Sequence, residues 1–305
     1  MDANNFKIKF RGVRGSYPVV NPRFSEYGGN TSCVEMNLDG HLIIFDGGTG
    51  IIGLGRELTR ISRSDNDEQM PRTITILLSH LHQDHIQGLN FFSPFNNPAF
   101  KISVIGLTTP DCSLLENLKE LVWGKSFPIN FSDLSAEIQT HSAVENRKII
   151  INNNSEFAHV VPSEEETKEE DIVISVMKSN SHPQNGVIVY RVSYKGKSVV
   201  YATDKESYVG SDKRMALFAR KADVLIHDSQ YTSEDYLSLT SSKQGFGHST
   251  YDMAIETAQV SQVKKLVFFH YAPNYDDNKL RQIENSYSVK YPNTVCSKEG
   301  LEICL

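Results

Sequence analysis

A short run of histidine and aspartate, placed directly after an apolar segment, constrains this chain more than any other feature. Residues 73–78 (TITILL) predict a buried strand. The next seven residues, SHLHQDH, supply His80, His82, Asp84 and His85. Imidazole and carboxylate are the groups that zinc and similar divalent ions bind. On a turn that leaves a strand, this dense set predicts two adjacent metal ions.

A polar loop with chance histidines is the alternative, and three later positions argue against it. Asp204 follows an apolar segment that ends in YAT, and His270 follows KLVFF. His182 precedes a further predicted strand at residues 187–194. A lone histidine is usually structural, but ligand-type residues at the ends of several strands can converge on one site. The predicted metal ligands are His80, His82, Asp84, His85, His182, Asp204 and His270.

Strand and helix patterns alternate along the chain and predict an α/β fold with helices covering sheets. An antiparallel pair is expected at residues 32–36 and 41–45, turned at Asp39-Gly40. Apolar residues recur at helical spacing in 51–61 and 250–260.

The segment at about 108–170 differs from its surroundings. It holds a helical stretch at 112–123 and an acidic tract, SEEETKEE, at 163–170. We interpret it as an insertion or cap over the site, with the acidic tract as a solvated loop.

Composition limits the partners and the compartment. The formal net charge of −6 disfavours a general surface grip on long nucleic acid. A small anion remains possible, because bound metal can reverse the local field. The four cysteines form no CxxC pair, which argues against a disulfide framework. No apolar run is long enough for a signal peptide or a membrane span, so we expect a cytoplasmic chain without a membrane partner.

The motif HLHQDH, followed by His182, Asp204 and His270, resembles the metallo-β-lactamase fold superfamily over roughly residues 6–275. The resemblance implies one domain over residues 1–305, a four-layer αβ/βα sandwich of two mixed sheets flanked by helices. It implies two divalent ions, Zn²⁺ first, with Mn²⁺ or iron as alternatives. One ion would take His80, His82 and His182. The other would take Asp84, His85 and His270, with Asp204 bridging. Relatives also suggest a homodimer.

Two further motifs resemble the tRNase Z-like branch of that superfamily. GHST at 247–250 opens a predicted helix, and HDSQ at 227–230 follows an apolar strand. The resemblance implies that His248 is catalytic and that Asp228, one methylene shorter than the usual glutamate, orients it. Ser249 and Thr250 would bind phosphate at the helix N-terminus. An ordinary helix cap is the alternative for this loop.

The N-terminal motifs RGSYP, YGGNTSC and DGGTG resemble the bacterial and phage subgroup that includes cyclic-nucleotide-degrading enzymes. No Gly/Pro-rich arm for gripping a tRNA elbow is apparent. We therefore predict a metal-dependent phosphodiesterase for a small phosphodiester, a cyclic nucleotide first, with Asn30 in the substrate pocket. Asp84 would accept a proton from the attacking water, and His248 would protonate the leaving oxygen. The alternatives are a tRNase Z-like RNA endonuclease, a thioester hydrolase and an inactive nucleotide-binding module.

Overall fold

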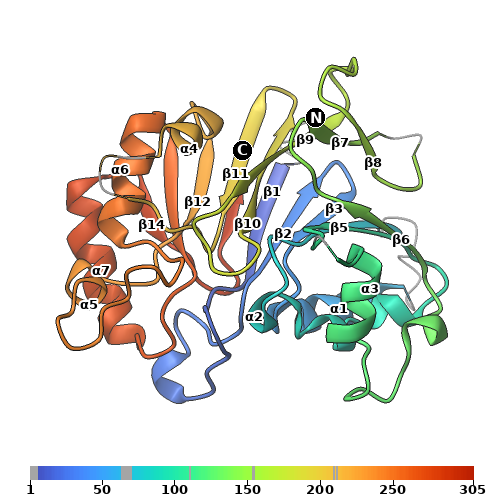
Figure 1. Ribbon diagram of the computed structural model, residues 1–305, viewed down its shortest axis with the longest axis horizontal. Coiled ribbons are helices and arrows are strands. Elements are labelled where there is room, and N and C mark those ends of the chain that lie inside the picture. Colours follow the sequence, from blue (N-terminus) through green and yellow to red (C-terminus); the bar gives the residue numbers. More distant parts are fainter. Residues whose placement is uncertain (1–5, 63–70, 110, 153–154, 209, 211) are drawn as a thin grey trace.

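Strand β3 (His41–Phe45) shows how the layers arise from sequence. Ile43 and Phe45 belong to one core, and Leu42 and Ile44 belong to another. Successive side chains of a strand point to opposite faces, so a strand that is apolar throughout must be covered on both sides. The first core lies between the two sheets and continues beneath the helices that cover the eight-stranded sheet, and the second lies between the seven-stranded sheet and its helices. The predicted four-layer α/β sandwich is therefore confirmed, as Figure 1 shows.

The computed structural model describes residues 6–62, 71–109, 111–152, 155–208, 210 and 212–305. Within these residues one seven-stranded sheet has the order β15 (Glu302–Cys304), β1 (Phe6–Gly12), β2 (Cys33–Leu38), β3, β4 (Thr73–Leu77), β5 (Lys101–Gly106) and β6 (Glu137–Ser142). An eight-stranded sheet has the order β14 (Thr294–Cys296), β13 (Lys265–Phe269), β12 (Val224–Asp228), β11 (Lys197–Ala202), β10 (Val187–Tyr194), β9 (Ile172–Ser179), β7 (Arg147–Ile151) and β8 (His159–Pro162).

Helices from the two halves of the chain cover opposite outer faces (Figure 1). Apolar residues of α1 (Gly50–Ile61) and α3 (Leu114–Leu121) pack on the seven-stranded sheet. Those of α4 (Lys213–Phe218), α6 (Tyr251–Ser261) and α7 (Asp277–Lys290) pack on the eight-stranded sheet. Two one-turn helices, α2 (Gln83–Ile86) and α5 (Ser233–Tyr236), lie in connecting loops. Among the described residues, every helix is too short or too polar to span a bilayer.

The local predictions agree with these elements. β2 and β3 pair antiparallel around Asp39 and Gly40, where both residues have positive φ angles. Asp39 is tolerated in this left-handed conformation because Asn, Asp and Gly adopt it most readily. The predicted helices correspond to α1 and α6, and Thr250 caps α6 by accepting a hydrogen bond from the Met253 amide.

The segment at about 108–170, which the sequence predicted to be an insertion or cap, contributes strands to both sheets. Its strand β6 pairs parallel with β5 at the edge of the seven-stranded sheet. Its strands β7 and β8 extend the eight-stranded sheet beyond β9. Before β6, α3 and the turns that follow it lie against the seven-stranded sheet. The sequence did not reveal these strands, because β6 and β8 are edge strands with few buried residues.

The fold brings the carboxyl ends of several parallel strands to one edge. β3 and β4 are parallel neighbours in one sheet, and β11, β12 and β13 are parallel neighbours in the other. The two sheets are joined there, because the Ile188 amide donates to the Ser79 carbonyl at 2.8 Å. Tyr190 also donates its hydroxyl to the Leu78 carbonyl at 2.8 Å. Residues that follow these strands therefore meet at a single place.

Candidate metal centre

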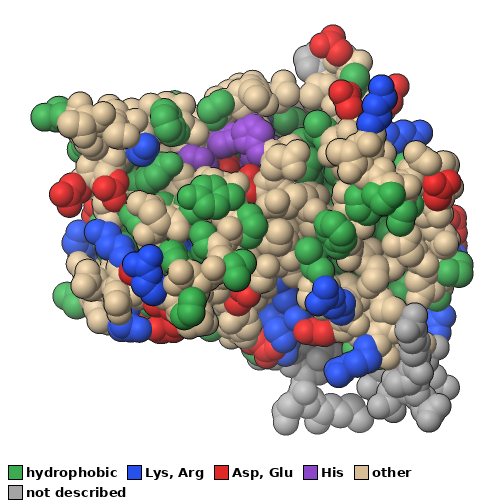
Figure 2. Space-filling view, turned by 90° about the horizontal axis from the view of Figure 1, so that it is seen from below, with side chains coloured by type: hydrophobic (Ala, Val, Ile, Leu, Met, Phe, Trp, Pro, Cys, Tyr) green, Lys and Arg blue, Asp and Glu red, His purple; other side chains and the backbone are tan. Residues whose placement is uncertain are grey.

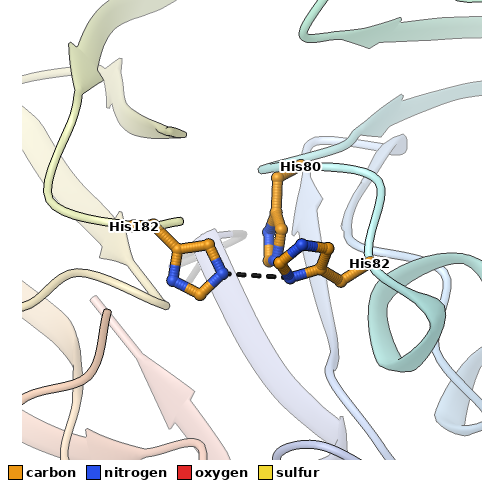
Figure 3. A group of neighbouring side chains, drawn as sticks. All are labelled: His80, His82 and His182. Atoms are coloured by element: carbon orange, nitrogen blue, oxygen red, sulfur yellow. Dashed lines mark hydrogen bonds between the residues drawn. The ribbon is translucent and has the colours of Figure 1, made fainter. Parts of the chain in front are cut away.

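Three histidines from loops of the two sheets point toward one another (Figure 3). His80 and His82 lie on the turn after β4, and His182 lies on the loop after β9. Nδ1 of His82 lies 3.0 Å from Nε2 of His182. One nitrogen from each ring falls within 4.8 Å of the others, which is close enough to share one ion. Figure 2 shows histidine side chains gathered together on one face of the molecule.

A second cluster lies beside the first and is fully buried. It consists of Asp84, His85, Asp204 and His270, whose ligand atoms also lie within 4.8 Å of one another. Nε2 of His270 is 3.1 Å from Oδ2 of Asp84. Nε2 of His85 is 3.3 Å from the same oxygen. The structure thus brings together all seven residues that the sequence analysis proposed as ligands.

Asp204 faces both clusters. Its Oδ1 lies 3.7 Å from Nε2 of His80 and 3.8 Å from Nε2 of His182. Its Oδ2 lies 3.1 Å from Nε2 of both His85 and His270. The backbone of Asp204 is left-handed, with φ of 50°. This geometry matches the bridging position that the resemblance implies.

Asp46 holds His85 in place from behind. The carboxylate follows β3 and accepts hydrogen bonds from the Ser79 amide at 2.7 Å and the Tyr201 hydroxyl at 2.7 Å. Nδ1 of His85 lies 2.8 Å from the same carboxylate. When the proton of the neutral ring is on Nδ1, Nε2 is unprotonated and can bind a metal ion; it is directed toward Asp84 and Asp204. Such outer contacts fix both the orientation and the tautomer of a ligand.

His182 is held by the loop that precedes α6. Nδ1 of His182 lies 3.1 Å from the Gly247 carbonyl oxygen. Gly247 has φ of 89°, and a Cβ there would lie 2.2 Å from His182 Nδ1. Buried Glu206 anchors this loop by accepting from the amides of Gly245 at 2.8 Å and Gly247 at 3.0 Å. The glycine and the buried carboxylate together set the position of the histidine.

The electrostatics of the second cluster favour cations. Burial lowers the pKa of His270, but Asp204, Asp228 and Asp84 outweigh this effect and raise that pKa to about 10. Burial likewise lowers the pKa of His85, yet neighbouring aspartates raise it well above its usual value. These carboxylates stabilise positive charge at the position where a divalent ion would supply it.

Two unsatisfied nitrogens also fit a metal. Nε2 of His80 and Nε2 of His85 are buried and make no hydrogen bond within the described part of the chain. A buried polar atom without a partner normally costs about 1–3 kcal/mol. Burial and the facing His85 lower the pKa of His80 well below its usual value, which keeps this imidazole neutral. Neutral imidazole is the form that binds metal, so the donor set fits two divalent ions.

His248 and Asp228 form a pair at the rim of the second cluster. Nδ1 of His248 lies 2.8 Å from Oδ2 of Asp228, so the shorter aspartate side chain does reach the imidazole. Asp228 is itself held by the backbone amides of Asp204, Ser249 and Gln230. Burial raises the pKa of Asp228, but His248 and His270 outweigh it and lower that pKa. The His248 ring stacks on His270 at a centroid distance of 5.2 Å.

The three predicted substrate-binding residues have other partners in the structure. Ser249 is buried, donates its hydroxyl to the Lys205 carbonyl and accepts from the Ser207 amide. Thr250 is buried and caps α6. Asn30 binds Glu299 through both its backbone and its side-chain amide. The hydroxyls of Ser249 and Thr250 therefore contribute to the structure of this loop, and a contact of either hydroxyl with phosphate stays a prediction.

Sequence reasoning missed Asp46, Tyr201 and Glu206 as supports of the site. One signal was available for Asp46, because it follows the apolar strand β3 just as the ligands follow theirs. Tyr201 lies in the apolar strand β11, where the sequence indicates a core residue. Only the hydrogen bond from its hydroxyl to Asp46 shows that it supports the site. Glu206 contacts residues about forty positions away along the chain, which no local pattern indicates.

Comparison with known proteins agrees with this geometry. The family model described as a beta-lactamase superfamily domain matches residues 41–271. The chain belongs to this superfamily. The match spans both sheets and includes every residue of the two clusters. The metallo-β-lactamase fold predicted from the motif order is confirmed.

The superfamily relatives include enzymes named Ribonuclease Z. That of Picrophilus torridus is 26% identical over 98% of this chain and 96% of its own length. That of Thermoplasma acidophilum is 25% identical over 91% of this chain and 90% of its own length. These matches agree with the resemblance to the tRNase Z-like branch that the sequence motifs indicate.

Solved structures share the superfamily fold at lower identity. The metallo-beta-lactamase fold protein YhfI from Bacillus subtilis has a TM-score of 0.63 and 16% identity, with 98% of each chain covered. Human tRNase Z, short form, has a TM-score of 0.59 and 18% identity, with 97% of this chain and 98% of that chain covered.

Proposed function

We propose that this superfamily member is a metal-dependent endonuclease that cuts an RNA phosphodiester bond, in the manner of tRNase Z. The observation that carries the proposal is the His248–Asp228 pair at 2.8 Å, directly beside two clusters of metal-ligand residues. The curated relatives named Ribonuclease Z, matched over nearly their whole length, support RNA as the first substrate to test.

The side chains divide the chemical work. Two bound divalent ions, Zn²⁺ first and Mn²⁺ or iron as alternatives, would supply an activated water and neutralise phosphoryl charge. Oδ2 of Asp84 accepts a hydrogen bond from the Ser16 amide at 2.7 Å, which leaves Oδ1 to accept a proton from the attacking water. The two clusters orient the phosphate so that attack on phosphorus is in line with the leaving oxygen.

His248 supplies the proton for the leaving oxygen. Its Nδ1 donates to Asp228, so Nε2 is the nitrogen that faces substrate. The buried Asp228 carboxylate fixes the imidazole ring through Nδ1, so that a proton carried on Nε2 can be transferred to the leaving oxygen. This division of roles follows the general logic of a catalytic imidazole, here a proton donor, that is oriented by a neighbouring carboxylate.

A small phosphodiester, such as a cyclic nucleotide, is the second candidate substrate. The net charge of −6 favours it, because long nucleic acid is usually gripped by a basic surface. The relatives named Ribonuclease Z weigh against that argument, since they match this chain throughout. The sequence analysis ranked these two substrates in the opposite order.

One substrate screen separates the candidates. The purified chain, with its metal content measured, is incubated with a tRNA transcript, an unstructured RNA of equal length, cyclic mononucleotides, cyclic dinucleotides and a thioester. Endonucleolytic cleavage of RNA is the expected result. Hydrolysis of cyclic nucleotides alone would establish the second candidate. Thioester hydrolysis alone, or tight nucleotide binding with no hydrolysis of any substrate by the metal-loaded chain, would overturn both.

A further inference from the structure

A cavity of about 250 Å³ opens directly beside the three-histidine cluster. His80 and His82 form one wall. The other walls are formed chiefly by Leu81, Leu107, Leu121, Asn117, Gln184 and Asn185. They come from the turn after β4, from α3 and the segment before it, and from the loop after His182. No residue of the site described above, other than the two histidines, reaches this cavity.

The lining selects the chemistry of the occupant. Three leucines provide apolar contact area, and three carboxamides provide hydrogen-bonding groups. The described lining contains no Lys, Arg, Asp or Glu, so it offers a charged phosphate no cationic side chain to pair with. The volume is slightly below the 300–1,000 Å³ that is typical of pockets for larger ligands. A flat, uncharged ring with a polar edge fits these walls, and a nucleobase is such a ring.

Asn117 provides a hydrogen-bond acceptor in the lining of the cavity. Its Nδ2 donates within α3 and the preceding segment, to the Ser113 carbonyl at 3.1 Å and to Thr109 Oγ1 at 3.3 Å. Both amide hydrogens are thereby used, and Oδ1 remains as an acceptor. The helix is fixed by the reciprocal cap between Ser113 and Glu116. An acceptor at a fixed position can accept from the exocyclic amino group of adenine, cytosine or guanine, whereas uracil offers only its ring N3–H.

The cavity and the metal cluster are linked by one short loop. His182 belongs to the cluster, and residues 183–186 line the cavity. Gln184 and Gly186 both have positive φ angles, of 65° and 77°. A Cβ on Gly186 would lie 2.4 Å from the Ser179 carbonyl oxygen, so this tight turn requires glycine. A ring seated in the cavity would therefore be held at a defined distance from a phosphate at the histidines.

We propose that this cavity is the base-binding subsite for a nucleotide next to the scissile phosphate, with a preference for an amino-bearing base. The inference rests on the proposed phosphodiesterase function, and it names the part of the substrate that is read. Binding of the base orients the phosphate over the clusters, so the subsite lowers KM for nucleotide esters. The subsite does not lower KM for esters that lack a base.

The test compares matched esters and one occluding variant. Leu121→Trp narrows the cavity at a residue that is 42% exposed, where a larger side chain is tolerated. Val289→Trp, at an 82% exposed position on α7, is the control. The substrates are adenosine 5′-(p-nitrophenyl phosphate), its uridine counterpart and methyl p-nitrophenyl phosphate, assayed by release of p-nitrophenolate. Binding of AMP to the metal-loaded chain is measured by calorimetry.

The parent chain should show a KM at least about tenfold lower for the adenosine ester than for the methyl ester, as expected for one base contact. Leu121→Trp should abolish this difference and weaken AMP binding about tenfold, while kcat on the methyl ester stays unchanged. Asn117→Leu should bring the adenosine and uridine esters to the same KM. Val289→Trp should behave as the parent.

An unchanged adenosine-to-methyl KM ratio in Leu121→Trp overturns the subsite. Equal AMP affinity in that variant and the parent, or no AMP binding by the parent, overturns it as well. If the parent releases p-nitrophenolate from none of the esters, the proposed function fails. AMP binding that is lost in Leu121→Trp still supports the subsite in that case, so the two failures are distinguishable.

Discussion

Three aspartates at strand ends perform three different tasks, because their neighbours differ. Asp46 holds the far side of the His85 ring, Asp204 lies between the two clusters, and Asp228 holds His248. The backbones of Asp46 and Asp204 are left-handed, with φ of 59° and 50°, and so is that of His270, with φ of 67°. Such conformations cost roughly 1–3 kcal/mol each. Here they turn side chains at strand ends inward toward one point.

Replacing His248 should separate proton transfer from metal binding. His248→Ala is expected to retain its metal and to lose about 10²–10⁴-fold in kcat on a substrate with a poor leaving group, since a general acid contributes this much. The loss on bis(p-nitrophenyl) phosphate should be much smaller, because p-nitrophenolate leaves without a proton. His159→Ala, at an exposed position on β8, is the control. Equal losses on both substrates would argue against an acid role.

Replacing Asp204 should instead affect the metal itself. Asp204→Ala removes the carboxylate that lies 3.1–3.8 Å from one nitrogen of each of four candidate ligand histidines, so both ions should bind more weakly. Metal content after extensive dialysis, measured by elemental analysis, is expected to fall below one ion per chain. Full occupancy in this variant would contradict the bridging role.

At the scale of elements, the loop before α6 links the two parts of the site. It carries both His248 and the Gly247 carbonyl that contacts His182, and Glu206 anchors it through two backbone amides. Tyr236 of α5 donates its hydroxyl to the same carboxylate at 2.5 Å. A single buried side chain thereby positions a loop that serves both a metal ligand and the proposed acid.

Glu206→Gln tests this arrangement. The amide group of glutamine presents an N–H toward a set of donors, so at least one donor loses its acceptor. We expect a loss of about 1–3 kcal/mol in the free energy of unfolding. Metal affinity should also fall, because the Gly247 carbonyl no longer fixes His182. Chemical denaturation and metal titration measure the two effects. Glu234→Gln, at an exposed position on α5, should change neither.

Asp223 joins the starts of β11 and β12, away from the metal centre. Its carboxylate accepts from the Ser198 amide and from Lys264, each at 2.8 Å. Burial raises the pKa of Asp223, but these two hydrogen bonds outweigh it and lower that pKa below its ordinary value of 3.8. A carboxyl group with a lowered folded-state pKa stabilises the fold above its unfolded-state pKa. This stabilisation is lost as the pH falls through the folded-state value.

Asp223→Asn should therefore unfold more easily than the parent at pH 7, by roughly 1–2 kcal/mol. The difference should shrink as the pH is lowered below about 4, where the parent carboxylate becomes protonated. Denaturant unfolding at several pH values measures it. A difference that stays constant from pH 7 to pH 3 would show that the charge of Asp223 is not the cause.

At the scale of the whole molecule, metal ions bound at the candidate centre would link the two sheets. Residues of the turn after β4 come from one sheet, whereas His182, Asp204 and His270 follow strands of the other. Ions held between them would stabilise the folded state, because the unfolded chain does not preform the site.

Removal of metal should consequently lower the thermal midpoint. At a free metal concentration of 100 times Kd, binding to the folded chain contributes about 2.7 kcal/mol. Scanning calorimetry with and without a chelator measures this contribution. Asp204→Ala, which should bind metal weakly, serves as the control and should respond little to the chelator. A parent chain that responds no more than this variant would contradict the stabilising role.

Local patterns in the sequence were sufficient for the elements and for the ligand set. Apolar runs such as residues 73–78 predict buried strands, and a polar ligand that follows each run predicts convergence at a sheet edge. The edge strands β6 and β8 were not predicted, because half-exposed strands carry too few apolar residues to show the two-residue alternation of a buried strand.

The sequence by itself determined the strands, the main helices and the seven residues that converge, because each is encoded by neighbours along the chain. Only the tertiary structure decided the hydrogen-bond partners of Asn30, Ser249 and Glu206. Asn30 is committed to Glu299, a residue 269 positions away. Hydrogen bonds between distant segments form only when the sheets have packed. A polar side chain therefore acquires its partner, and hence its role, from the complete fold.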